Sequence, residues 1–349
     1  MTLIDLIASV ERTPLRTPFV TALRRVEAVE SIKVTLMSAS GTVGIGEAPP
    51  TVAITGEDTA SIVETLKKLR PAMLHQEFSD VDQATEALHG ALEGHGSAKA
   101  AVDMALYDLF SKEAGVPLYA FLGGGERPLF TDVTISLNVP EMMARDAARA
   151  LQNGFRSLKV KVGGRDGLDV ERLRAVRNAV GGDAALLVDA NQAWEEAEAL
   201  RIIEAIAPLN IVLVEQPLPA EDLEGMRRVT RAASIPILAD ESAFTLEEVR
   251  RVVESGAADC INVKLMKCGG VSRARHILEY CRDAGVACMM GSMLEGPYSI
   301  AAAMHLSMAY PDTVRWHDLD SPLLYRSLNA SAPVGFEGDR LFLRHSVGL

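Results

Sequence analysis

Charged residues end a series of short apolar runs between residues 157 and 264, at a nearly constant interval. The runs end in Lys161, Asp189, Glu215, Asp240 and Lys264. Three carboxylates in one pocket would repel one another, and a hard divalent cation among them would remove that repulsion. Ligands that are all oxygen, without His or Cys, suit Mg²⁺ better than zinc. If these residues meet, they predict a magnesium site with a lysine on either side.

A lysine beside such a site could exchange a proton with a bound substrate. Lysine is a poor base at its ordinary pKa of about 10.4. Lys159 projects to the same face of the strand as Lys161, and a metal would add positive charge, so we expect the pKa of Lys161 to be depressed. Lys267 comes three residues after a strand end. We interpret it as a loop residue, or as one that supports the site from behind.

Each of these charges has a simpler explanation when it is taken alone. A strand-end Asp is most often the N-cap of the next helix. A lone Lys159 or Lys161 would be a solvated charge, and Lys264 could equally bind a phosphate ahead of Gly269-Gly270. The repetition of charges at the same point of successive units argues against these explanations as a set.

The apolar runs themselves indicate how these residues are positioned. Runs of about five residues, each followed by a helical pattern, are typical of βα units in a parallel sheet, and a repeat of about 25 residues favours a closed (β/α)₈ barrel. The carboxyl ends of barrel strands converge, which would bring the charges together. The predicted strands are residues 131–136, 157–162, 185–189, 211–215, 236–240, 260–264, 287–290 and 314–318.

The N-terminal part of the chain has a different pattern. Residues 1–50 alternate apolar and polar positions, as in an antiparallel meander, and helical patterns follow at 59–69, 82–92 and 97–112. Stretches 13–25 and 48–58 contain Pro, Gly and Thr, so we expect long loops that contribute to substrate specificity. We predict an α+β capping domain at 1–125, a barrel at 126–320, and a segment at 321–349 whose strand 340–343 returns to the capping domain.

Composition limits the classes of function. The chain has 349 residues, is 48% hydrophobic and carries a net charge of −12, which argues against a nucleic-acid partner or an anionic membrane surface. Its four cysteines lack CxxC spacing, so neither disulfides nor zinc are expected. The N-terminus has no basic region before an apolar run, and no run is long enough for a membrane span. We therefore expect a cytoplasmic protein.

Together these motifs resemble the enolase superfamily, and within it the muconate-lactonizing subgroup, over essentially the whole chain. The residues 100–109 and 118–124 are also similar to the capping-domain signature of that family. The resemblance implies that Asp189, Glu215 and Asp240 bind Mg²⁺. It further implies that Lys161 and Lys264 are the acid and base on opposite faces of the substrate, with Lys159 as their electrostatic neighbour. The matching motifs are Lys159-Val-Lys161, Asp189-Ala-Asn191, Glu215-Gln-Pro217, Asp240-Glu-Ser242 and Lys264-Leu-Met-Lys267-Cys-Gly-Gly270.

The end of the eighth predicted strand favours one branch of the subgroup. Asp318-Leu-Asp320 resembles the dipeptide epimerases, in which both aspartates hold the substrate's free α-ammonium. The stretches 18–24 and 51–56 resemble the members that act on L-Ala-L/D-Glu, where Arg24 would bind the Glu side chain. The resemblance thus implies epimerisation of L-Ala-L/D-Glu, in the recycling of cell-wall peptides. The implied substrate-binding residues are Arg24, Thr134, Asn191, Ser292, Asp318 and Asp320.

Other functions stay open at this point. Epimerases of other dipeptides, N-acyl amino acid racemases, cycloisomerases and o-succinylbenzoate synthases share the lysines and the metal, although the substrates of the last two lack an ammonium for Asp318 and Asp320. Arg24 could also be a solvated charge. A metal-binding scaffold without activity is a further alternative. We expect a homo-oligomer whose partner is a small dipeptide.

Overall fold

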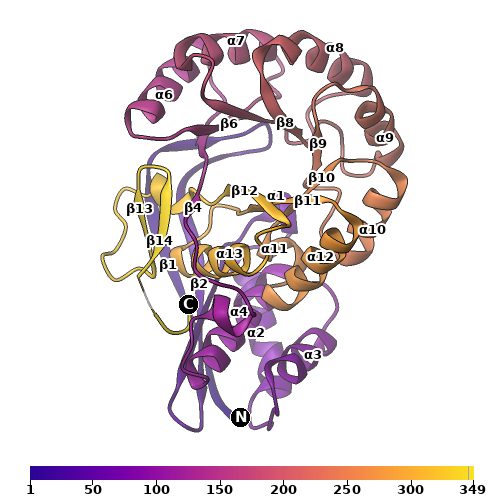
Figure 1. Cartoon of the computed structure of the whole chain (residues 1–349). Helices are drawn as coiled ribbons and strands as arrows, with labels where there is room; N and C mark the ends of the chain where they lie inside the picture. Colours follow the sequence, from indigo (N-terminus) through magenta and orange to yellow (C-terminus); the bar gives the residue numbers. More distant parts are fainter. Residues whose placement is uncertain (345) are drawn as a thin grey trace.

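A barrel of eight parallel strands forms the larger part of the molecule (Figure 1). The computed structural model describes residues 1–344 and 346–349. The sheet runs in chain order, with parallel pairing throughout. The predicted (β/α)₈ arrangement is confirmed, and every predicted strand is found. The strands are β5 (Val133–Ile135), β6 (Ser157–Lys161), β7 (Ala185–Asp189), β8 (Ile211–Glu215), β9 (Ile237–Ala239), β10 (Cys260–Val263), β11 (Ala287–Gly291) and β12 (Val314–Asp318).

Helices cover the outside of the barrel, and local sequence sets where they begin and end. Thr245 and Glu248 form a capping box at the start of α10, and Gly256 ends that helix with a φ of 67°. Apolar side chains of β7, β8, β9 and β11 fill the barrel interior. The helices and turns are α6 (Pro140–Gln152), α7 (Asp169–Val180), α8 (Glu196–Ile206), η1 (Ala207–Leu209), α9 (Leu223–Ala232), α10 (Leu246–Ser255), α11 (Leu265–Cys268), α12 (Val271–Ala284), α13 (Pro297–Ala309) and η2 (Ser321–Leu324).

The predicted meander and its helices form the N-terminal domain. Its antiparallel sheet has the order β1-β2-β3, and α4 packs closely on β3. A Cβ on Gly44 or Gly46 would lie 2.1 Å or 1.9 Å from a carbonyl oxygen of α4, so glycine at both positions permits this approach. The elements are β1 (Leu3–Val20), β2 (Arg25–Ser38), β3 (Val43–Ala48), α1 (Val52–Thr55), α2 (Thr59–Met73), α3 (Val81–Ala91), α4 (Gly96–Glu113) and α5 (Leu118–Phe121).

The prediction of a long loop at 13–25 is wrong. Strand β1 extends to Val20 and pairs with β2 from Arg25 onward, so that only residues 21–24 form the turn. Pro14 and Pro18 suggested a loop, but β1 is an edge strand, where a missing N–H is tolerated. The pairing register also shifts between Pro14 and Phe19. The second predicted loop, 48–58, contains only the one-turn helix α1.

The strand expected at 340–343 exists, but it does not join the N-terminal sheet. Strand β14 (Arg340–Leu343) pairs with β13 (Val334–Glu337) and with β4 (Leu129–Phe130). The C-terminal segment contacts the N-terminal domain elsewhere. The backbone N–H of Arg326 donates to Pro14, and that of Leu349 donates to Asp108. The domain limits 1–125, 126–320 and 321–349 stay predictions.

Buried carboxylates join the N-terminal domain to two barrel helices. Asp103 of α4 accepts a hydrogen bond from the N–H of Ser272 at the start of α12, and Glu47 of β3 accepts one from Tyr298 at the start of α13. Carboxylates are favourable at helix N-termini because the first N–H groups there lack helical partners. These contacts fix the capping domain against the barrel. Among the described residues, no helix is both long and apolar enough to cross a bilayer.

Candidate active site

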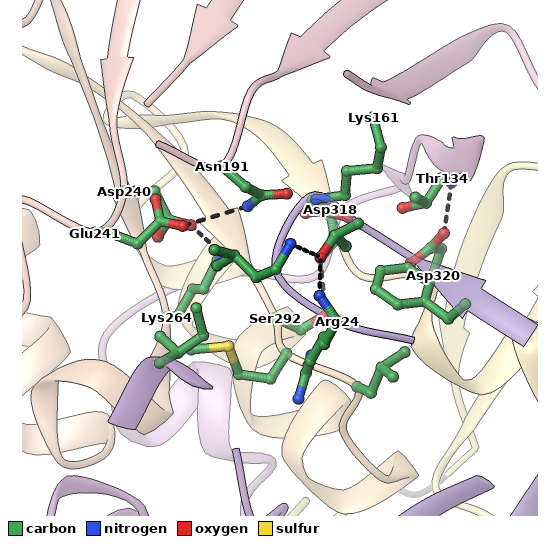
Figure 2. Close-up of a pocket in the computed structure, with 16 residues that line it drawn as sticks. Arg24, Thr134, Lys161, Asn191, Asp240, Glu241, Lys264, Ser292, Asp318 and Asp320 are labelled. Atoms are coloured by element: carbon green, nitrogen blue, oxygen red, sulfur yellow. Dashed lines mark hydrogen bonds and ion pairs between the residues drawn. The ribbon is translucent and has the colours of Figure 1, made fainter. Parts of the chain in front are cut away.

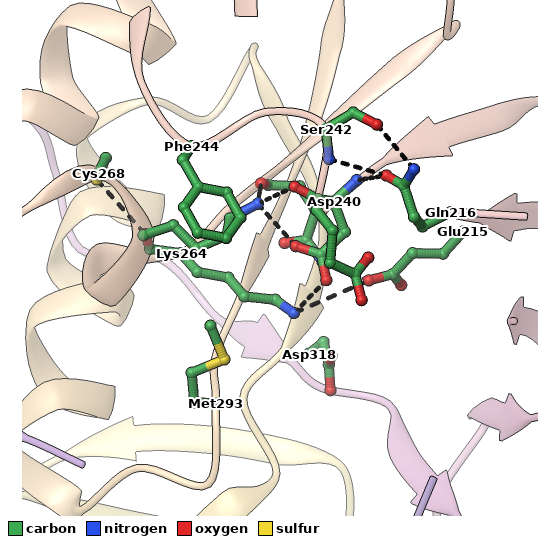
Figure 3. A network of polar contacts seen from close by, with 12 residues as sticks. Glu215, Gln216, Asp240, Ser242, Phe244, Lys264, Cys268, Met293 and Asp318 are labelled. Atoms are coloured by element: carbon green, nitrogen blue, oxygen red, sulfur yellow. Dashed lines mark hydrogen bonds and ion pairs between the residues drawn. The ribbon is translucent and has the colours of Figure 1, made fainter. Parts of the chain in front are cut away.

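The predicted carboxylates lie side by side at the carboxyl ends of three neighbouring strands. Asp189 and Glu215 are register partners at the ends of β7 and β8, and Asp240 follows β9 directly. All three are buried, with exposed fractions of 2% or less. Figure 3 shows Glu215, Asp240 and Lys264 in one network of polar contacts. The convergence expected from a parallel barrel therefore occurs here.

Two lysines flank this group, because the strands that carry them lie on either side of β7, β8 and β9. Lys161 ends β6, and its Nζ lies 2.5 Å from Asp189 Oδ2. Lys264 follows β10, and its Nζ lies 2.6 Å from Asp240 Oδ2. Both lysines line one cavity together with Asp240 (Figure 2). A substrate in this cavity would therefore lie between two ammonium groups.

Burial and neighbouring charges act in opposite directions on the three carboxylates. Burial raises the pKa of Glu215 to about 7, with Asp189 adding to the rise and Lys159 opposing it. Burial would also raise the pKa of Asp189, but Lys161 and Lys159 lower it below its usual value. At Asp240, burial would again raise the pKa, but Lys264 and Lys267 lower it below its usual value. The lysines thus hold Asp189 and Asp240 in their charged forms.

Lys159 contacts more carboxylates than Lys161 or Lys264 does. Its Nζ lies 2.6 Å from Asp318, 2.8 Å from Glu215 and 3.2 Å from Asp189. Burial alone would lower the pKa of Lys159, but these carboxylates raise it well above its usual value. Burial would also lower the pKa of Lys264, but Asp240 raises it above its usual value. What distinguishes Lys159 is its position, because Lys161 and Lys264 line the cavity and Lys159 is not among the lining residues.

The oxygen atoms in this region fit a hard divalent cation. Asn191 Oδ1 and Glu241 Oε2 are buried near Asp240 and have no hydrogen-bond partner in the described part of the chain, which is a costly state for buried oxygens. Carboxylate and amide oxygens are the ligands that Mg²⁺ prefers. In the described part of the chain, no group of three or more Asp, Glu, His or Cys side chains is arranged so that it could hold one metal ion. Instead, Lys161 and Lys264 lie against two of the carboxylates.

Strained backbone marks the same strand ends. Asn191, Gln192 and Gln216 have φ angles of 45°, 69° and 36°, a region that residues with a Cβ rarely adopt and that is concentrated at functional sites. The strain at Gln216 places its side chain so that Oε1 accepts hydrogen bonds from the N–H groups of Asp240 and Ser242. Gln216 was not among the predicted site residues, although it belongs to the Glu215-Gln-Pro217 motif.

Two further side chains hold the carboxylates from behind. Asn262 Nδ2 donates to Glu215 Oε1 over 2.8 Å, and Lys267 Nζ donates to Asp240 Oδ1 over 2.7 Å. Lys267 lies in the one-turn helix α11 rather than in a loop, and it supports the site from behind. Sequence reasoning missed Asn262, although it stands two residues before Lys264 and so points to the same side of its strand.

The predicted substrate-binding residues all line the cavity that contains Lys161 and Lys264. Asp318 and Asp320 form the acidic part of this cavity. There, Asp320 Oδ2 accepts a hydrogen bond from the Thr134 N–H over 2.7 Å, and Ser292 Oγ donates to the backbone oxygen of Asp318 over 3.0 Å. Burial and Asp318 raise the pKa of Asp320 to about 6. Asp189, Glu215 and Lys159 lie behind these residues, fully buried. The lining residues that sequence reasoning missed are Glu241, Met293 and Leu294. Four others, Phe19, Thr21, Leu23 and Ile54, were not named singly but lie in the stretches 13–25 and 48–58 that were predicted to contribute to specificity.

Arg24 brings an unmatched positive charge to the cavity. It lies in the turn between β1 and β2 and is half-buried. Among the described residues no carboxylate lies within 4 Å of its guanidinium, whereas other arginines of the chain form ion pairs. Burial lowers the pKa of Arg24 from its ordinary value. A partly desolvated cation without a partner is costly, so this position suits an anionic group of a ligand.

Comparison with known proteins places this fold and site in a family. Residues 3–123 match the mandelate racemase/muconate lactonizing enzyme N-terminal domain, and residues 142–349 match the enolase C-terminal domain-like model. The chain belongs to this family, and the predicted enolase-superfamily membership is confirmed.

Particular relatives match nearly end to end. The L-Ala-D/L-Glu epimerase of Bacillus subtilis is 42% identical, over 96% of this chain and 93% of its own length. Its solved substrate complex has a TM-score of 0.97 at 40% identity, covering 100% of this chain and 98% of that one. A dipeptide epimerase from Enterococcus faecalis, solved with Mg and L-Leu-L-Tyr, has a TM-score of 0.94 at 36% identity, covering 100% and 99%.

Proposed function

We propose that this protein is a Mg²⁺-dependent epimerase that inverts the α-carbon of the C-terminal residue of L-Ala-L/D-Glu, in the recycling of cell-wall peptides. The observation that carries the choice of substrate is the half-buried Arg24, which lines the cavity and has no acidic partner in the part of the chain that the structure describes. It fits the side-chain carboxylate of Glu. The acidic pair Asp318 and Asp320, in the same cavity, fits the α-ammonium of Ala, which has three donors.

The two lysines perform the proton transfer. One lysine removes the α-proton of the C-terminal residue, and the other returns a proton to the opposite face. At the start of each turnover one lysine is neutral and the other protonated, and the two states are exchanged at its end. Mg²⁺ held by Asp189, Glu215 and Asp240 would supply positive charge against the negative charge that develops next to the substrate's terminal carboxylate.

Lys159 contributes without transferring a proton to or from the substrate. As a fixed cation in contact with Asp189 and Glu215, it offsets part of the negative charge of the carboxylates behind the cavity. The positive groups of the site act on charge that appears only as the proton leaves, so they lower the barrier rather than merely tighten binding.

Relatives support both this proposal and a second candidate. Proteins 42% identical to the chain are L-Ala-D/L-Glu or L-amino acid-D/L-Glu epimerases, whereas a relative from Enterococcus faecalis at 38% identity is a hydrophobic dipeptide epimerase. The second function is favoured by the apolar side chains that line the cavity around Arg24, namely Phe19, Leu23, Ile54, Met293 and Leu294. These would accept an apolar C-terminal residue.

The two candidates are separated by substrate preference in two variants. Loss of the charge-assisted pair with Glu should cost about 1.5–3 kcal/mol, or roughly ten- to a hundredfold in kcat/KM. Arg24→Met should therefore impair turnover of L-Ala-L-Glu far more than that of L-Ala-L-Met. Asp320→Asn is the matched control, because both substrates have the ammonium and should be impaired alike. An unchanged Glu/Met preference in Arg24→Met would contradict the assignment to L-Ala-L/D-Glu and favour the hydrophobic dipeptides.

A further inference from the structure

A buried aspartate near the acidic part of the cavity has no role in the proposed reaction. Asp132 directly precedes β5 and is 3% exposed. Both of its carboxylate oxygens are buried, and neither has a hydrogen-bond partner among the residues that the structure describes. Its backbone is held in place, because its N–H donates to the carbonyl oxygen of His317 in β12 over 3.0 Å. The position of this carboxyl group is thus set by the barrel itself.

Asp132 belongs to the acidic group formed by Asp318 and Asp320. It lies two residues before Thr134, on the same side of the extended chain, and Thr134 lines the cavity and holds Asp320. Burial raises the pKa of Asp132 well above its usual value, and Asp318 and Asp320 raise it further. The hydrogen bonds from the N–H of Asp132 to His317, which precedes Asp318, and from the N–H of Thr134 to Asp320 place these residues side by side.

The charges around Asp132 are not balanced by the chain. Burial would raise the pKa of Asp318, but Lys159, Lys161 and Lys264 lower it. The ammonium that lowers the pKa of Asp132 is that of Lys159, which already contacts Glu215 and Asp189. An unpartnered buried carboxyl group destabilises the folded protein, and the structure offers no hydrogen bond that would explain its retention for stability. A cation that entered beside Asp318 and Asp320 would favour the charged form of Asp132 and relieve the imbalance.

We propose that Asp132 is a positioning and specificity residue that makes the cavity selective for substrates with a free α-ammonium group. The inference rests on the proposed function and extends it. Asp132 does not touch the substrate. Its raised pKa keeps it uncharged in the empty cavity. It ionises when an ammonium group enters beside Asp318 and Asp320, and the new negative charge attracts that group through the low-dielectric interior of the barrel.

The test compares a dipeptide that has a free α-ammonium group with the same dipeptide in which that group is acetylated and therefore uncharged. For Asp132→Asn, which keeps the shape but cannot ionise when the ammonium binds, KM for L-Ala-L-Glu should rise about tenfold, the order of one partly screened charge interaction, while kcat stays within about twofold. The inhibition constant of N-acetyl-L-Ala-L-Glu, which has no ammonium, should stay the same or fall. The melting temperature should not decrease, because no hydrogen bond is lost. Asp132→Ser provides a second variant should the first fold poorly.

The control and the contrary outcomes are equally specific. Asp259→Asn makes the same replacement of a carboxyl group by an amide at an exposed residue that precedes β10, and it should change neither constant. Two outcomes would overturn the inference about Asp132 and leave the proposed function standing. One is an equal change for the two ligands in Asp132→Asn, and the other is a lower melting temperature with an unchanged KM. A wild-type protein that neither binds nor turns over the dipeptide would overturn the proposed function and this inference with it.

Discussion

Lys159, Lys161 and Lys264 have the same functional group, and their surroundings give them different properties. Lys159 contacts three carboxylates and is fully buried, so it is held as a cation. Lys161 and Lys264 border the cavity, where a substrate can reach them. This division could not be predicted from residue type. It follows from where each strand places its side chains.

At the scale of residues, the metal assignment leads to a direct prediction. EDTA should abolish epimerisation and excess Mg²⁺ should restore it. Asp240→Asn should weaken Mg²⁺ binding at least about tenfold, because a charged oxygen ligand is replaced by a neutral group. Calorimetric titration with Mg²⁺ measures this effect independently of activity. Full activity of metal-free protein would rule the metal centre out.

At the scale of elements, the contact between β10 and β11 shows how backbone geometry sets the site. Asn262 of β10 donates to Glu215, and its side chain lies against Gly291 at the end of β11. A Cβ at position 291 would be 2.3 Å from Asn262 Oδ1, so a larger residue must displace the amide. The absence of a side chain at Gly291 is thus part of what holds Glu215.

Gly291→Ala is therefore expected to reduce kcat about tenfold or more, since displacing Asn262 removes a hydrogen bond to a charged group. Gly182→Ala is the matched control, because an added Cβ there has no neighbour within 4 Å. Steady-state kinetics of both variants measure the difference. A Gly291→Ala protein with wild-type kcat would show that Asn262 does not position Glu215.

The elements could largely be predicted from the sequence, because buried parallel strands are continuous apolar runs and their charged ends are visible. The positions of the predicted lysines and metal-binding carboxylates also followed from the ends of their strands, whereas Arg24 lies in a turn. The last part of strand β1, residues 13–20, was predicted as a loop, because prolines on an edge strand resemble loop residues. Gln216 and Asn262 were missed because their roles depend on contacts between strands, which local patterns do not contain.

At the scale of the whole molecule, the capping domain completes the cavity that the barrel begins. Phe19, Arg24 and Ile54 come from the N-terminal part, whereas the lysines and acidic residues come from the barrel. Glu47 and Asp103 join the two parts at the starts of barrel helices. The residues proposed to transfer protons and those proposed to select the Glu side chain therefore lie on separate units that are held together by buried polar contacts.

The measurement that tests the central claim most directly is hydrogen exchange in D₂O, followed by NMR, with L-Ala-L-Glu and L-Ala-D-Glu as separate substrates. Lys161→Ala and Lys264→Ala should each slow epimerisation at least about a hundredfold, since each removes one acid–base group. Each variant should still exchange the α-proton of Glu in one of the two dipeptides, and the two variants should differ in which one. Racemisation at the wild-type rate by either variant would contradict a mechanism with one lysine on each face.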